Sequence, residues 1–411
     1  MPDLHFPQGF LLGAATAAHQ VEGDNRGNDF WRSEMLGLFP ERSGEACRHY
    51  ALFREDFALA RSFGHNAHRF SLEWSRIEPS PGRFDDAALH HYREVVEELR
   101  RLAIEPIVTL QHFTLPVWFA DAGGWLAPRA AELFGRYVQH VASWLGPRVR
   151  FWITVNEPTV WAKHALVLGH WPPHRRHDWR AAARAILALA RAHRRAYAIL
   201  HRIQPDAWVG IAHSAPFVEP ARPRDPRDRW VAWMRDLALN RLPLALFRRH
   251  LDFLGVNYYT RALVCWGWGG TAPLFGRDWP YPHGSTPRRF SDLGWEIHPE
   301  GLYRQLHRLA RLGLPLMVTE NGIATRDELL RVRFLEEHLA AVARALAEGV
   351  PVIGYLWWSL LDNFEWHCGF APRFGLFETD YVTFARHPRP AAFRFAEIAG
   401  QRSVTAASEA H

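Results

Sequence analysis

The stretch R-F-W-I-T-V-N-E-P (residues 150–158) contains an apolar run of strand length that ends in Asn156 and Glu157. A second stretch, P-L-M-V-T-E-N-G (residues 315–322), repeats this arrangement and ends around Glu320. Short, mostly apolar runs of this kind are typical of strands buried in a parallel sheet. We therefore expect two core strands that each place a glutamate at the same edge of one sheet.

Around these two stretches, apolar strand-like runs alternate with longer segments that have apolar residues at helical spacing. The predicted strands are 10–16, 67–73, 104–111, 151–155, 209–213, 253–257, 316–319 and 352–357. The predicted helices are 49–63, 86–102, 128–145, 178–203, 228–242, 299–312, 326–347 and 388–399. Eight strands alternating with eight helices predict parallel pairing, and eight strands close a barrel.

The sequence thus predicts the α/β class, with residues 1–411 forming a single (β/α)8 TIM barrel catalytic domain whose active site lies at the C-terminal ends of the strands. An open doubly wound sheet is the alternative fold. It would usually carry a glycine-rich phosphate-binding turn after its first strand. Here A-A-H-Q-V-E-G (residues 17–23) follows instead, and this favours the barrel.

Polar and aromatic side chains follow the predicted strands at their C-terminal ends. Such groups are poor core residues, and in a barrel they converge on the mouth where active sites lie. They are Gln20, Arg69, Glu73, Trp74, His112, Asn156, Glu157, Asn257, Tyr258, Tyr259, Glu320, Asn321, Trp357 and Trp358.

Charge and composition limit the classes of protein to consider. The net charge is +6, but the arginines recur between apolar positions at helical spacing, as in residues 178–202. This indicates the solvated outer faces of helices, not a focused basic stripe, so we expect no nucleic-acid partner. No apolar run reaches the length of about 18 residues that a membrane span needs.

Two further features indicate a cytoplasmic protein. The apolar stretch 10–18 lacks the preceding positive charge of a secretion signal, so we interpret it as a buried strand. Cys47, Cys265 and Cys368 are far apart and odd in number, which argues against a disulfide framework and favours a reducing compartment.

The two glutamates suggest glycoside cleavage. This reaction needs a carboxylic acid that protonates the departing oxygen and a carboxylate on the other side of the anomeric carbon. Glu157 and Glu320 follow the fourth and seventh predicted strands, so they would face each other across the barrel mouth. The alternative is that each caps a helix or pairs with an arginine, but both are flanked by Asn at a strand end.

The chain resembles glycoside hydrolase family 1, the β-glucosidase family, nearly from end to end. The matching motifs are F-P-Q-G-F-L-L-G-A-A-T-A-A-H-Q-V-E-G (6–23), H-R-F-S-L-E-W-S-R-I (68–77), T-V-N-E-P (154–158), D-F-L-G-V-N-Y-Y-T (252–260), V-T-E-N-G (318–322), W-W-S-L-L-D-N-F-E-W (357–366) and R-F-G-L-F-E-T-D-Y (373–381). Their shared order and spacing make the resemblance specific.

The resemblance implies a retaining double displacement. Glu157 would be the general acid and later the base, and Glu320 would attack the anomeric carbon. Arg69 and Tyr259 match family residues that contact the nucleophile and would keep it ionised, and Asn257 is assigned with Arg69 to its support. Glu157 must instead hold its proton near neutral pH.

The resemblance also implies a set of sugar-binding residues. Some would hydrogen-bond ring hydroxyls, including the 2-hydroxyl, while the tryptophans would offer flat apolar faces to the sugar and its leaving group. The set comprises Gln20, His112, Asn156, Tyr259, Trp295, Trp358, Glu365 and Trp366.

The substrate that we expect is a small β-D-glucoside, β-fucoside or β-galactoside without phosphate. Relatives that act on 6-phosphorylated sugars lack the glutamate at the position of Glu365 and carry a serine- and lysine-containing pattern nearby. Residues 368–375 contain no lysine, and Arg373 is the remaining candidate for a phosphate contact. We expect no cofactor and no metal in the reaction, and a possible homo-oligomer.

Two features depart from the family. Phe113 stands where many relatives have a tryptophan, which removes an indole N–H from the sugar site. The segment between Asn240 and Leu251 is also short. A shortened or missing helix there would leave the barrel wall thinner, and we expect residues 227–250 to be mobile or covered by a partner subunit.

Two other functions compete. The histidine-rich stretch H-W-P-P-H-R-R-H (residues 170–177) suggests a metal-dependent hydrolase, but the pair Pro172–Pro173 indicates a loop and no acidic ligand follows at metal-site spacing. A sugar-binding protein without catalysis is the second alternative. The presence of both Glu157 and Glu320 favours an enzyme.

Overall fold

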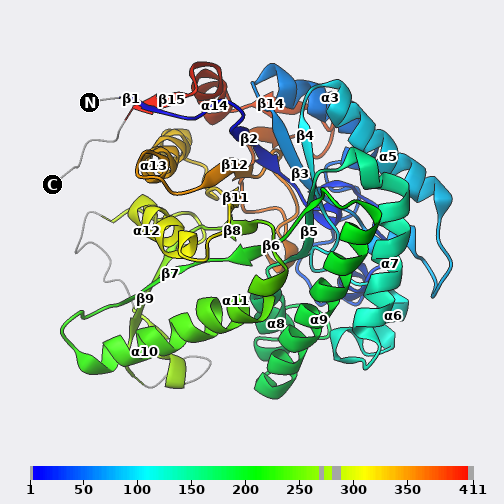
Figure 1. Cartoon of the computed structure of the whole chain (residues 1–411), viewed down its shortest axis with the longest axis horizontal. Helices are drawn as coiled ribbons and strands as arrows, with labels where there is room; N and C mark the ends of the chain where they lie inside the picture. The colour runs from blue at the N-terminus through cyan, green and yellow to red at the C-terminus, as the bar shows by residue number, and fades with distance from the viewer. Residues whose placement is uncertain (1–2, 268–272, 280–287, 406–411) are drawn as a thin grey trace.

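Eight parallel strands close into a barrel in the computed structural model, which describes residues 3–267, 273–279 and 288–405 (Figure 1). The order around the barrel is β2 (Leu11–Ala15), β3 (Ala67–Ser71), β4 (Glu105–Thr109), β5 (Phe151–Asn156), β6 (Trp208–Ser214), β8 (Leu254–Asn257), β11 (Leu316–Asn321) and β12 (Val352–Trp358), with β12 paired to β2. Each corresponds to one predicted strand. The predicted (β/α)8 barrel is confirmed, and the open sheet is wrong.

Helices surround the strands (Figure 1). The longer ones are α3 (His49–Ser62), α5 (Asp86–Arg101), α7 (Ala130–Leu145), α9 (Trp179–Ile203), α10 (Pro226–Asp236), α12 (Pro299–Ala310), α13 (Glu328–Ala347) and α14 (Pro390–Gln401). Shorter ones are α1 (Ala18–Val21), α2 (Asp29–Met35), α4 (Trp74–Ile77), α6 (Val117–Asp121), α8 (Pro158–Ala162) and α11 (Leu242–Phe247).

Small antiparallel pairs and one three-stranded sheet lie outside the barrel. Strand β1 (Asp3–His5) pairs with β15 (Ser403–Thr405), which brings the two ends of the described chain together (Figure 1). The other strands are β7 (Phe217–Pro220), β9 (Arg261–Cys265), β10 (Arg277–Asp278), β13 (Phe377–Thr379) and β14 (Arg386–Pro388).

Local sequence explains where the outer helices begin and which face they bury. In α5, the Asp85 carboxylate accepts hydrogen bonds from the free N–H groups of Ala87 and Ala88 at the helix start. Leu89 and Val96 are then fully buried at helical spacing. In α9 the buried positions are mostly alanine and leucine, whereas Arg191 is exposed. The spread-out arginines therefore lie on solvated helix faces, as predicted.

The apolar stretch near the N-terminus forms the barrel strand β2, as predicted. Ala14 and Ala15 are fully buried. A Cβ atom on Gly13 would lie 1.7 Å from the carbonyl oxygen of Ala67, so only glycine lets β2 approach β3 this closely. None of the helices in the described part of the chain has the length and apolar character that crossing a bilayer requires.

The segment before Leu251 contains a short helix, which agrees with the first of the two expectations, a shortened or a missing helix. After α10, the chain continues through a π-helical turn (Leu237–Arg241) into α11 and a short 3-10 turn (Arg248–His250). Leu244 and Phe247 of α11 are buried in the main core. A π-helical turn accommodates an extra residue inside a helix, so residue counting alone did not reveal this continuous path. Mobility or coverage by a partner remains a prediction.

Candidate active site

The two glutamates lie at the C-terminal ends of different barrel strands. Glu320 is the fifth residue of β11, and Glu157 directly follows β5 and precedes α8. Both side chains are buried, with 4% and 8% of the residue exposed. Glu157 has a left-handed backbone with φ of 42°, a conformation that costs a non-glycine residue roughly 1 kcal/mol or more and is common at functional sites.

Glu320 is held by a cation and a phenol. Arg69 Nη1 donates to Glu320 Oε1 at 2.5 Å, and the Tyr259 hydroxyl donates to the other oxygen, Oε2, at 2.8 Å. The Arg69 side chain is itself fully buried. A buried guanidinium that donates to one carboxylate oxygen and a phenol that donates to the other both favour the ionised carboxylate. Arg69 and Tyr259 thus contact Glu320, where the sequence analysis expects them.

Glu157 has a different environment. Among the described residues, no arginine or lysine forms an ion pair with it. The amide Nδ2 of Asn257 donates to Oε1 at 3.0 Å, and the Ser214 side chain also hydrogen-bonds to it. Burial, together with the negative charge of Glu320, raises the pKa of Glu157 above its ordinary value. A carboxyl group with a raised pKa keeps its proton near neutral pH.

Asn257, which the sequence analysis assigns to the support of Glu320, has its side-chain contacts with Glu157, Asn156 and Thr319. Its side-chain amide donates to Glu157, and also to Asn156 Oδ1 at 3.2 Å. The Thr319 hydroxyl donates to Asn257 Oδ1 at 2.6 Å, and this fixes which end of the amide faces Glu157. Sequence reasoning missed Thr319, although its place directly before Glu320 in the strand was visible.

Asn156 links the two glutamate environments. Its Oδ1 accepts from Arg69 Nη2 at 2.7 Å, and its Nδ2 lies 3.0 Å from His112 Nε2. Burial, with the nearby charge of Arg69, lowers the pKa of His112 well below its usual value, so this imidazole is neutral. Because Nδ2 of an amide can only donate, Nε2 of His112 accepts and its proton sits on Nδ1. That buried Nδ1–H has no protein partner in the described structure and is free to donate to a ligand.

A second group of predicted site residues gathers around β12 and the segment that follows it. Trp358 Nε1 donates to Glu365 Oε1 at 3.2 Å, and Gln20 Nε2 donates to the Phe364 carbonyl at 2.9 Å. The His112 ring stacks against Trp358 and Trp366, with centroid separations of 5.8 and 6.0 Å. His112 therefore joins this group to the glutamate network.

Two polar atoms of this second group are set up to meet a ligand. Burial raises the pKa of Glu365 to about 8. The buried Oε1 of Gln20 has no partner among the described residues. Buried polar groups without partners are costly unless a ligand or water satisfies them. Both features favour a bound molecule with several hydroxyl groups.

Trp295 and Phe113 define two further sides of the site. Trp295 is 38% exposed, and its ring centroid lies 5.5 Å from that of Tyr259. It therefore lies at the rim, where a leaving group would extend. Phe113 is buried and packs on Trp171 with a centroid separation of 4.6 Å. Trp171 was not singled out from the sequence, although it lies in the histidine-rich stretch 170–177.

One group of three histidines in the described part of the chain is close enough to hold a metal ion, and it lies outside the carboxylate network. The buried site itself is built from carboxyl, amide, imidazole, guanidinium and indole groups. Two buried carboxyl groups in unequal surroundings, with tryptophans nearby, can perform acid–base and nucleophilic chemistry on a sugar.

Known proteins resemble this chain over almost its whole length. A family model described as glycosyl hydrolase family 1 matches residues 3–242 and 235–403. The β-glucosidase A of Thermotoga maritima is 32% identical, with 96% of this chain and 97% of the relative covered. A β-galactosidase of Sulfolobus acidocaldarius is also 32% identical, with 98% and 96% covered.

Solved structures of similar proteins have the same fold as this chain over almost its whole length. A β-glycosidase from Pyrococcus horikoshii is 39% identical with a TM-score of 0.92, covering 98% of this chain and 97% of that chain. The β-glucosidase from Thermotoga maritima in complex with glucoimidazole is 30% identical with a TM-score of 0.89, covering 97% and 99%.

Proposed function

This chain belongs to glycosyl hydrolase family 1, and on that premise we propose that it cleaves β-glycosidic bonds by double displacement, with Glu320 as nucleophile and Glu157 as acid and then base. The observation that carries these roles is the unequal surroundings of the two carboxyl groups. Glu320 is bonded to Arg69 and Tyr259, whereas Glu157 is buried with a raised pKa.

In the first step, ionised Glu320 attacks the anomeric carbon and forms a glycosyl ester. The bond to the leaving oxygen breaks, and Glu157 gives its proton to that oxygen. The Arg69 guanidinium and the Tyr259 hydroxyl hold the attacking carboxylate in place, which lowers the entropy cost of the attack.

In the second step, Glu157 is ionised and takes a proton from water, whose oxygen attacks the anomeric carbon and releases Glu320. The Asn257 amide at 3.0 Å stabilises the ionised form of Glu157 at this stage. An alcohol in place of water would give transglycosylation with the same residues. Asn156, fixed by Arg69 and Asn257, is the proposed donor to the sugar 2-hydroxyl.

We propose that Gln20, His112 and Glu365 bind the other ring hydroxyls, that Trp358 and Trp366 contact the sugar faces, and that Trp295 contacts the leaving group. The free Nδ1–H of His112 and the free Oε1 of Gln20 support this assignment. The preferred substrate is a β-D-glucoside, β-fucoside or β-galactoside without phosphate. A protonated Glu365 offers a phosphate one donor and an ionised one offers none. Arg373 is already paired with Asp362.

Several coarser properties complete the proposal. Residues 1–411 are proposed to form one catalytic domain that acts in the cytoplasm, without a cofactor, a nucleic acid or a membrane as partner. A small-molecule glycoside or oligosaccharide is the substrate, and a homo-oligomer is possible. The exposed arginines recur between buried apolar positions of helices such as α9, which supports the absence of a nucleic-acid partner.

A covalent trap tests the roles of both glutamates. In a 2-deoxy-2-fluoro aryl β-glucoside, the fluorine destabilises the positively charged transition states and slows both steps. The good leaving group keeps the first step fast, so the glycosyl-enzyme accumulates. Mass spectrometry of peptides should find one glycosyl group on Glu320. Label on Glu157, or no label at all on an enzyme that turns over, would overturn the assignment. Aryl glycosides that differ at C2, C4 and C6, including a 6-phosphate, then test the substrate class.

A further inference from the structure

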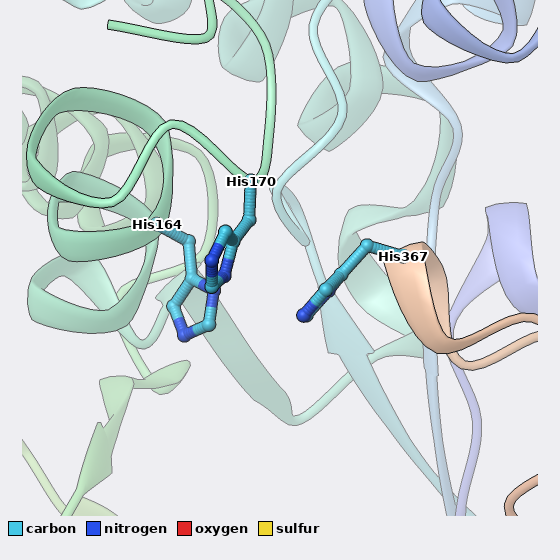
Figure 2. Close-up of side chains that lie close together, drawn as sticks. All are labelled: His164, His170 and His367. Carbon is cyan, nitrogen blue, oxygen red and sulfur yellow. The ribbon is translucent and has the colours of Figure 1, made fainter. Parts of the chain in front are cut away.

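Three histidines from two segments far apart in the sequence point toward one another (Figure 2). His164 lies in a π-helical turn (Lys163–Val167) after α8, and His170 follows in the next loop. His367 lies in the 3-10 turn (Trp366–Cys368) after β12. Each ring offers one nitrogen, and these three atoms lie within 4.8 Å of one another. None of the three takes part in the proposed hydrolysis.

We propose that His164, His170 and His367 bind one divalent transition-metal ion, with Zn²⁺ as the best match. The Nδ1 atoms of His164 and His170 are 3.3 Å apart. Two imidazole nitrogens bound to Zn²⁺ at about 2.0–2.1 Å with tetrahedral angles would be roughly 3.3 Å apart. The separation of this pair is thus already that of two ligands, and His367, whose ligand atom lies within 4.8 Å of both, would move closer on binding.

The chemistry of the donors narrows the choice of ion. All three ligands are imidazoles, which suit Zn²⁺, Cu²⁺ and Ni²⁺, whereas Mg²⁺ and Ca²⁺ prefer oxygen ligands. The imidazoles must be neutral to bind. Three protein ligands leave a fourth position for water or a small anion.

The neighbouring Trp171 orients two of the three rings. It stacks on His164 with a centroid separation of 4.5 Å, and its indole N–H donates to His367 Nδ1 at 3.0 Å. One hydrogen is shared between the Nδ1 atoms of His164 and His170, and a metal ion bound to both atoms would replace it. If His367 binds through Nδ1, the metal ion also replaces the hydrogen given by Trp171. Metal binding should therefore alter the environment of Trp171.

The position of this histidine cluster gives it a structural consequence. It would join the loop after β5 to the turn that begins at Trp366, a proposed sugar contact. The stretch H-W-P-P-H-R-R-H (residues 170–177), which raised the alternative of a metal-dependent hydrolase, is a loop, as predicted. Within it, His174 bonds to Ser33 at 2.9 Å instead. The other two members of the cluster with His170, His164 and His367, lie outside this stretch.

Calorimetric titration of the untagged, chelator-stripped full chain with ZnCl₂ tests the proposal. One Zn²⁺ should bind per chain and raise the melting temperature, and Co²⁺ should give the visible absorption bands of a tetrahedral site. His170→Asn should weaken Zn²⁺ binding by more than about tenfold, because loss of a ligand exceeds the loss of a supporting residue. His177→Asn, in the same loop but outside the cluster, should bind Zn²⁺ like the parent.

Two results would overturn the proposal. One is the absence of a stoichiometric Zn²⁺ site in the parent, which would leave the cluster as a packing contact between two loops. The other is equal affinity in the parent and the His170→Asn variant. Turnover of an aryl β-glucoside after chelation is a separate measurement. It should be retained, because the proposed hydrolysis uses no metal, so a failure of one proposal is distinguishable from a failure of the other.

Discussion

The ends of β5 and β11 carry the same type of side chain in opposite surroundings. At the end of β11, Glu320 receives hydrogen bonds from a buried guanidinium and a phenol. At the end of β5, Glu157 receives one from the neutral amide of Asn257 and faces the charge of Glu320. The residue type therefore does not determine the role. In the proposed mechanism, the ion pair of Arg69 with Glu320, and the lack of an ion pair at Glu157 among the described residues, distinguish the nucleophile from the acid.

The largest effect is expected when one of the two carboxyl groups, that of Glu320, is removed. Glu320→Ala should lower turnover by a factor on the order of 10⁴ to 10⁶, because no covalent intermediate can form. Azide or formate should restore activity and give a product of inverted stereochemistry, which NMR of the product detects. Glu132→Ala, a change at an exposed surface ion pair, serves as the control and should keep full activity. Rescue with retained stereochemistry would contradict the role of Glu320.

Removing the acid should give a loss that depends on the leaving group. Glu157→Ala should slow cleavage of an alkyl β-glucoside by about 10²–10⁴-fold, since this leaving group needs a proton. Aryl substrates with acidic phenols need little protonation and should lose much less in the first step. Steady-state and pre-steady-state kinetics on both substrates separate the two cases. Equal losses on alkyl and aryl substrates would place the acid elsewhere.

A smaller effect should come from weakening only the surroundings of Glu320. Tyr259→Phe removes one hydrogen bond to a charged group, which contributes about 1.5–3 kcal/mol, so kcat/KM should fall by roughly 10–100-fold. Tyr303 donates to Glu348 at 2.6 Å on the surface, which makes Tyr303→Phe a matched control with unchanged kinetics. If both variants behave alike, the Tyr259 contact does not distinguish the nucleophile.

The smallest effect is expected from a change in the surroundings of Glu157. Asn257→Ala removes a donor to the ionised form and should raise the pKa of Glu157 further. The acid must be protonated to act, so activity is lost as pH rises through this pKa, and a higher pKa moves the alkaline limb of kcat/KM upward. We expect a shift of about half to one pH unit. A pH profile on an alkyl glucoside measures it, and a limb that stays in place or moves down would remove Asn257 from this role.

The sequence predicts the parts of the molecule that depend on local pattern. The eight barrel strands follow from short apolar runs, and the placement of Glu157 and Glu320 follows from their strand ends. The partner of Asn257 could not be predicted, because the hydroxyl of Thr319 on the adjacent strand fixes its amide. Strand pairing makes these neighbours, and no local pattern records it.

The same limit applies to longer-range contacts. The bond between Trp171 and His367 joins residues 196 positions apart, so the histidine cluster emerges only after the barrel closes. The length of the segment before Leu251 left open whether its helix is shortened or missing, and the structure has a short one, Leu242–Phe247. Length alone could not show that a π-helical turn joins this helix to the preceding one with no loop residues between them.

The left-handed backbone at Glu157 has a consequence for the evolution of this protein. A glutamate there is held against its conformational preference and with a buried carboxyl group, so the fold would be more stable with asparagine, which tolerates this region. Glu157→Asn should abolish acid catalysis yet raise the unfolding free energy by about 1 kcal/mol, as chemical denaturation can measure. The fold thus retains a destabilising residue for the sake of turnover, a trade-off between stability and activity at a single position.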